Sequence, residues 1–98
     1  DWRAHLPALK EWKAEGRLRY LGVTHYTQSA HDELESVMRA ETWDFVQLNY
    51  ALDDRAVERR LLPLAQESGI AVIVNQPFGG GGLLRKLMAR KLPDWAGE

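Results

Sequence analysis

Three short, largely apolar runs recur along this chain at intervals of about 25 residues, and helical spacing fills the intervals between them. We expect strands over 20–24, 45–49 and 70–74. Strands that are apolar throughout, rather than strictly alternating, are typical of a sheet covered on both faces. Regular alternation of strand and helix predicts an α/β fold with a parallel sheet built from crossover units.

Helical periodicity precedes the first run and follows the others. The first predicted helix places four large side chains on one face, namely Trp2, Leu6, Leu9 and Trp12. Gly16 and Gly69 are expected to end the first and third helices, because glycine tolerates the left-handed conformation found at helix C-termini. A fourth helix is expected after the glycines at 79–82.

The helix starts are expected to carry side-chain caps. Thr27 or Ser29 is predicted to cap the second helix, and Asp53 and Asp54 are predicted to cap the third. Pro63 should kink or restart the third helix, because it has no amide hydrogen to donate.

The repeat is too short for a closed barrel. A TIM (β/α)8 barrel needs about 250 residues, whereas this chain has 98. We therefore expect residues 1–98 to be a fragment of a single domain, a partial TIM barrel of about three parallel strands. An open doubly wound sheet is the alternative, but no GxGxxG or GxxxxGK[ST] fingerprint supports it.

Charge and composition exclude several classes of partner. Lys plus Arg number 13 and Asp plus Glu 14, which argues against binding to nucleic acid or to an anionic membrane surface. No apolar run approaches the roughly 20 residues that span a bilayer. The chain has no cysteine, and its histidines lack the ligand spacing of a metal site, so we expect no metal. A reducing, cytoplasmic location agrees with this composition.

Polar residues stand where each predicted strand ends. They are Thr24-His25-Tyr26, then Gln47, Asn49 and Tyr50, then Asn75-Gln76-Pro77-Phe78 with four glycines behind. In parallel α/β barrels the active site is formed at the carboxyl ends of the strands. The sequence therefore places candidate chemistry at one edge of the sheet.

The motifs resemble those of the aldo/keto reductase family, in the same order and over nearly the whole chain. Residues 16–26 (GRLRYLGVTHY) are similar to the family stretch written G-K-I-R-x-I-G-V-S-N-F. Residues 43–50 (WDFVQLNY) are similar to its D-x-x-Q-x-x-Y strand, and residues 61–72 to its next helix and strand. Residues 75–84 (NQPFGGGGLL) resemble a Gly-rich form of its cofactor loop.

The resemblance implies binding of a nicotinamide cofactor, NADP(H) in most of the family. Thr24, His25 and Gln47 match residues that hydrogen-bond the nicotinamide carboxamide, with His25 in place of the usual Asn. Asn75 matches an aromatic residue that stacks on the ring, which an amide cannot do in that way. The remaining implied cofactor residues are Gln76, Pro77 and Phe78, and Gly79 and Gly80 at the pyrophosphate.

The implied activity is reduction of an aldehyde or ketone, a small-molecule carbonyl substrate. The family's catalytic Asp, Tyr, Lys and His align upstream of Asp1, so the chain is expected to be an internal piece with no catalytic residue of its own. Tyr20, Tyr26 and Tyr50 are not in the catalytic motif. A non-catalytic barrel subunit with a regulatory or assembly role is the alternative, and an unrelated phosphate-binding barrel enzyme is a third.

Overall fold

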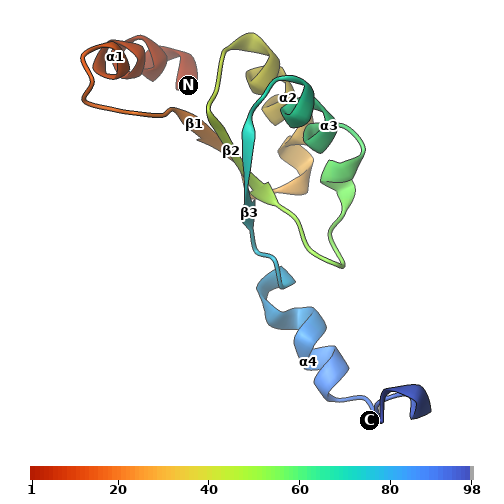
Figure 1. The fold of residues 1–98 in the computed structure, drawn as a ribbon. Coiled ribbons are helices and arrows are strands. Elements are labelled where there is room, and N and C mark those ends of the chain that lie inside the picture. The colour runs from red at the N-terminus through yellow and green to blue at the C-terminus, as the bar shows by residue number, and fades with distance from the viewer. Residues whose placement is uncertain (98) are drawn as a thin grey trace.

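The computed structural model describes residues 1–97, in which three parallel strands alternate with helices (Figure 1). The helices are α1 (Trp2–Ala14), α2 (His31–Ala40), α3 (Leu61–Glu67) and α4 (Gly82–Met88). The strands are β1 (Gly22–Thr24), β2 (Phe45–Asn49) and β3 (Ala71–Asn75). Short 3-10 turns are η1 (Gln28–Ala30), η2 (Ala56–Glu58), η3 (Gly79–Gly81) and η4 (Asp94–Ala96).

The sheet has the order β1-β2-β3, and both pairings are parallel. Sequence neighbours are therefore sheet neighbours, and α2 and α3 lie together on one side of the sheet (Figure 1). This arrangement agrees with part of a TIM barrel, whose helices form a single outer layer. A doubly wound sheet would have helices on both faces. The prediction of a partial barrel is confirmed in its strands, helices and pairing.

The core lies between the sheet and the helices. Val46 and Leu48 of β2 are 0% and 1% exposed. The other buried side chains of this core are Leu6, Leu21, Leu34, Val37, Met38, Trp43, Val57, Leu61, Leu64, Ala65 and Ile70. Of the predicted face of α1, Leu6 is buried, whereas Trp12 is 40% exposed.

Two glycines end helices as predicted. Gly16 has φ of 75°, and the Arg17 amide donates to the Trp12 carbonyl across the end of α1 at 2.9 Å. Gly69 has φ of 67°, and the Ile70 amide donates to the Ala65 carbonyl at 2.8 Å. Both are the 6→1 hydrogen bonds of a Schellman motif. Each glycine thus ends a helix and turns the chain toward the following strand.

The predicted side-chain caps are wrong. Thr27 precedes η1 but makes no side-chain cap hydrogen bond, and α2 begins after Ala30. Asp53 and Asp54 lie in a turn before η2, which begins after Arg55 without a side-chain cap. The Asp54 carboxylate instead accepts from Gln28 Nε2 at 2.7 Å. The Asp54 side chain is thus held by η1 rather than by the adjacent helix, and the Thr27 hydroxyl lies 3.3 Å from His25 Nδ1 in its own loop.

Other boundaries shift by a few residues. The first strand begins at Gly22 instead of residue 20, and the third covers Ala71–Asn75 instead of 70–74. The third helical segment is divided into η2 and α3, and Pro63 lies in the first turn of α3. This agrees with the prediction that Pro63 would kink or restart the helix. The helix expected after the glycines is α4, which has no buried residue and extends away from the sheet (Figure 1).

Within residues 1–97, none of the helices has the length and apolarity needed to cross a membrane. The same residues hold no group of three or more side chains suited to a metal ion.

Candidate cofactor-binding site

The register of the sheet places the predicted carboxamide contacts next to one another. Thr24 of β1 pairs with Gln47 of β2, which pairs with Ile73 of β3. One step further along the strands, Asn49 pairs with Asn75. Because successive strand residues alternate between faces, these side chains lie opposite buried Val46 and Leu48. They therefore lie on the face of the sheet that α2 and α3 do not cover.

Hydrogen bonds connect three of the predicted residues. The His25 amide donates to the Gln47 carbonyl at 3.1 Å, which extends the β1–β2 pairing by one residue. Gln47 Nε2 donates to Asn75 Oδ1 at 3.4 Å. His25 and Gln47 are thus joined through the main chain, whereas Gln47 and Asn75 are joined through their side chains.

Sequence reasoning named Asn49 among the polar residues at the strand ends but not among the cofactor contacts, although it lies on the same face as Gln47. Its Nδ2 donates to the Tyr26 carbonyl at 2.7 Å and so holds the loop after β1. Its Oδ1 is buried without a hydrogen-bond partner in the part of the chain that the structure describes. Strand periodicity from Gln47 was the signal that could have found it. An unpaired buried acceptor is costly, so this oxygen marks a place where a donor is needed.

The loop after β3 is less closely joined to these strand-end residues. Gln76 has φ of 49°, Pro77 follows it, and Phe78 is 63% exposed. Gly79 and Gly80 lie in η3, where both have positive φ. No hydrogen bond between residues 76–80 and the side chains of Thr24, His25 or Gln47 is present among the described residues. The strand-end residues therefore lie together in the structure, whereas residues 76–80 lie along the connection from β3 to α4.

A carboxylate lies against the Gly-rich loop. A Cβ added at Gly79 would stand 2.9 Å from Asp53 Oδ1. Asp53 was predicted as a helix cap, and its approach to the loop was missed because nothing in the local sequence pairs positions 53 and 79. A negative charge here opposes the binding of a phosphate. The strand ends suit a carboxamide, whereas the loop in this conformation suits a pyrophosphate less well.

Tyr50 directly follows β2, and its hydroxyl is hydrogen-bonded away from the strand-end residues. It donates to Glu58 Oε1 at 2.5 Å, and Arg55 donates to both oxygens of the same carboxylate. The hydrogen bond to Glu58 raises the pKa of Tyr50, and Arg55 and Tyr50 lower the pKa of Glu58. This tyrosine is held in its protonated form by a structural partner, which is the opposite of what a proton donor to substrate needs.

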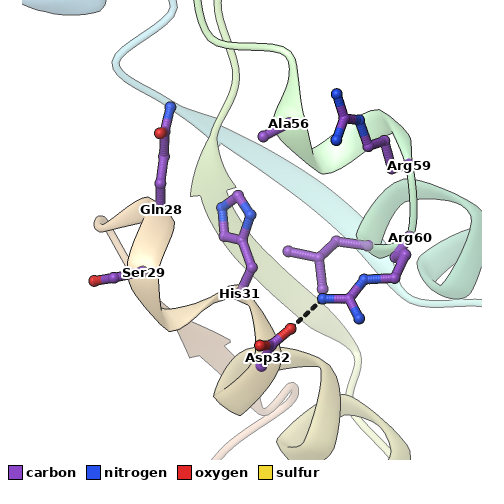
Figure 2. Close-up of a pocket in the computed structure, with 8 residues that line it drawn as sticks. Gln28, Ser29, His31, Asp32, Ala56, Arg59 and Arg60 are labelled. Atoms are coloured by element: carbon purple, nitrogen blue, oxygen red, sulfur yellow. Dashed lines mark hydrogen bonds and ion pairs between the residues drawn. The ribbon is translucent and has the colours of Figure 1, made fainter.

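The cavity in Figure 2 is a separate, ion-paired feature. It measures about 410 Å³ and lies between the start of α2 and the η2–α3 segment. Arg60 is paired with Asp32 and with Glu35, and the pairing raises its pKa. Arg59 is exposed. None of the predicted cofactor residues lines this cavity.

The comparisons with known proteins agree with this geometry. The model of the "Aldo/keto reductase family" matches residues 2–94. The chain belongs to the aldo/keto reductase family. It is 32% identical over 88 residues to an "NADH-specific methylglyoxal reductase" of Escherichia coli (strain K12). It is also 26% identical over 85 residues to a "Probable aldo-keto reductase 1" of Glycine max.

These matches cover 90% and 87% of this chain, but only 26% and 24% of the two relatives. The chain thus spans about a quarter of the length of these aldo/keto reductases. No solved structure matches it. The family is one of nicotinamide-dependent oxidoreductases, but the first relative is named for NADH, so the expectation of NADP gains no support from it.

Proposed function

We propose that this chain is the part of an aldo/keto reductase that holds the nicotinamide of a reduced dinucleotide cofactor, in a protein that reduces aldehydes or ketones. The observation that supports this most is the hydrogen bond between the amide side chains of Gln47 and Asn75 at the carboxyl ends of β2 and β3, with Thr24 of β1 in register beside Gln47. Active sites of parallel barrels lie at this edge. When bound, the nicotinamide supplies the hydride that reduces the carbonyl carbon.

The residues of the chain have a positioning role in this proposal. The Thr24 hydroxyl both donates and accepts, and Gln47 and Asn49 bring amide groups to the same face. A carboxamide has an NH₂ donor and a carbonyl acceptor, so this set of side chains can orient the ring. Asn75 cannot stack on the ring, whereas Phe78 is exposed on the following loop and can cover it.

Proton transfer to the carbonyl oxygen is assigned to residues outside this chain. The hydroxyl of Tyr50 is held by Glu58. The isolated 98-residue chain is therefore proposed to be inactive. Gly79 and Gly80 are proposed to pass over the pyrophosphate after the loop moves away from Asp53.

The test is titration of the full-length protein with NADH and with NADPH, followed by an assay with small aldehydes and ketones. Binding of either cofactor together with carbonyl reduction would support the proposal, and the ratio of the two affinities would decide between NADPH and NADH. Gln47→Met should weaken cofactor binding, because it removes both amide groups at nearly constant volume. Binding of neither dinucleotide would refute the proposal and leave a non-catalytic barrel subunit as the better hypothesis.

A further inference from the structure

The charges of this chain are unevenly distributed along it. Residues 68–93 contain Arg85, Lys86, Arg90 and Lys91 and no Asp or Glu, so this segment carries a charge of +4. The rest of the chain has nine Lys and Arg residues and 14 Asp and Glu residues, and therefore carries −5. The net charge of −1 thus conceals a cationic segment that includes α4. Such asymmetry is typical of chains that bind an anionic partner.

The four cations of this segment are exposed and make no ion pair with any other residue of 1–97. Elsewhere in the same range, six Lys and Arg residues are paired with six carboxylates. The positive charge around α4 is therefore not neutralised by the described part of the chain, whereas much of the charge in the body is.

α4 also has an exposed apolar side. Leu84, Leu87 and Met88 lie on one side of the helix, and Met88 is 86% exposed. Arg85 and Lys86 lie on the opposite side, because successive residues of an α-helix turn by about 100°. No residue of α4 is buried, and the helix extends away from the sheet (Figure 1). The helix is thus amphipathic, and neither of its sides is covered.

The apolar surface continues past the end of the helix. Leu92 is 74% exposed, and Trp95 in η4 is 85% exposed. Exposed leucine, methionine and tryptophan side chains beside unpaired cations are typical of helices that lie in the interface of a lipid bilayer. Tryptophan favours the level of the headgroups, because its ring is apolar and its N–H donates.

We propose that residues 82–95 bind the surface of an anionic lipid bilayer, with α4 lying on the bilayer and not crossing it. The apolar side of α4 enters the boundary of the acyl chains, and the four cations contact anionic headgroups. This inference goes beyond the proposed function, because it concerns where the protein is held rather than what it binds at the strand ends.

A bilayer suits this segment better than a second copy of the chain does. A second copy would have to offer carboxylates to the cations, and six of its 14 are already ion-paired. An anionic bilayer has a dense layer of headgroups above an apolar layer, so it complements the charge and the apolar side together.

The first measurement is flotation of the full-length protein with vesicles made either of phosphatidylcholine alone or of equal parts of phosphatidylcholine and phosphatidylserine. We expect binding to the anionic vesicles at low salt, and its loss at about 1 M salt, where charges are screened within about 3 Å. Equal binding to both compositions, or to neither, would overturn the inference. Titration with NADH and NADPH without vesicles tests the proposed function separately, because α4 holds none of the proposed cofactor residues.

Two double variants separate the local cations from net charge. Arg85→Gln with Lys86→Gln should weaken binding to the anionic vesicles by about tenfold. Arg19→Gln with Arg59→Gln is the matched control, because it removes two exposed cations that are likewise not ion-paired among residues 1–97. The control should stay within about threefold of the wild type. Equal losses in the two double variants would show that α4 has no special part in binding.

Met88→Gln tests the apolar side at nearly constant volume. It should weaken vesicle binding by about fivefold and leave the melting temperature unchanged. Leu52→Gln, at an exposed side chain outside α4, should change neither. A lower melting temperature of Met88→Gln would show that α4 packs on its own barrel in the full-length protein. Self-association that Met88→Gln abolishes in sedimentation velocity would show that a second copy covers this side. Either result would overturn the inference.

Discussion

The two faces of β2 meet different surroundings. Val46 and Leu48 point toward the helices and are almost fully buried, whereas Phe45, Gln47 and Asn49 on the other face are half-buried. β3 shows this contrast at one pair of residues, because Val72 packs against the core and Ile73 is 45% exposed, whereas Val74 on the helix side is 42% exposed. One face holds the chain together, and the other presents the candidate site. Because side chains alternate along a strand, the residues that stabilise the fold lie on one face and the candidate site residues lie on the other.

The uncovered face is not uniformly polar. Its layer at the amino ends of the strands contains Gly22, Phe45 and Ala71, the middle layer contains Thr24, Gln47 and the apolar Ile73, and the layer at the carboxyl ends contains Asn49 and Asn75. The Phe45 ring packs edge-on against Tyr20, with centroids 5.5 Å apart. A barrel interior is arranged in a similar way. Its layers toward the amino ends of the strands are packed with apolar side chains, and the edge at the carboxyl ends carries the site.

The largest expected effect concerns the buried face. Leu48→Ala should destabilise the protein by about 2–5 kcal/mol, because it leaves a cavity in a packed core. If the full-length protein closes the barrel, Ile73→Ala should reach a similar cost, since Ile73 then faces a filled interior. Chemical unfolding of both variants measures this, with Leu52→Ala as the control at an 81% exposed side chain. A cost near zero for Ile73→Ala would show that the second face stays open.

A smaller effect contrasts the packed part of the chain with α4. Gly16 needs φ of 75° to end α1, so Gly16→Ala should destabilise the protein by about 1–2 kcal/mol. Gly82 has φ of −62° at the start of α4 and open space around it. Gly82→Ala should be neutral or stabilising by about 0.4–1 kcal/mol. Thermal unfolding compares the two, and a loss of stability in Gly82→Ala would reveal packing on α4.

The sequence predicted what depends on local periodicity. The three strands, the four helices, the glycine C-caps and the division at Pro63 all follow from spacing and backbone preference. The cap predicted at Asp53 and Asp54 failed because these side chains face segments far along the chain, whereas the Thr27 hydroxyl lies against His25 in its own loop. Gln28 bonds Asp54, and Asp53 approaches Gly79, pairs that no local pattern indicates. Of the site, Gln47 and His25 were predicted from motif positions, whereas the hydrogen bonds from the Tyr26 and Thr27 amides to the His25 ring needed coordinates.

The amino ends of the strands offer a pH-dependent contrast with the carboxyl ends. Asp44 Oδ2 accepts from Lys13 Nζ at 2.5 Å and from the Leu21 amide at 2.8 Å, and these contacts lower its pKa. The unfolded chain then binds more protons than the folded one in acid, so this stabilisation is present above about pH 4 and is lost as pH falls through the folded pKa. It ties α1 to the sheet far from the candidate site.

Asp44→Asn keeps an oxygen for the Leu21 amide but loses the ion pair with Lys13. We expect lower stability at neutral pH and a smaller loss of stability between about pH 4 and more acid conditions. Urea unfolding at a series of pH values measures this, and Glu67→Gln at an exposed carboxylate is the control. Cofactor affinity should stay unchanged. An unaltered acid dependence in Asp44→Asn would assign the acid sensitivity to other carboxylates.

The smallest effect concerns the charge beside the Gly-rich loop. Asp53→Asn removes a carboxylate that lies against Gly79 and should strengthen cofactor binding by about two- to threefold at low salt. The gain should shrink as salt screens the exposed charge. Asp54→Asn is the matched control, because Asp54 is the next residue along the chain and its carboxylate accepts from Gln28 instead of facing the Gly-rich loop. Equal effects of the two variants would indicate only a change in net charge. Weaker binding in Asp53→Asn would mean that this carboxylate holds the loop in its binding conformation. The negative charge would then favour binding at the pyrophosphate end of the cofactor instead of opposing it.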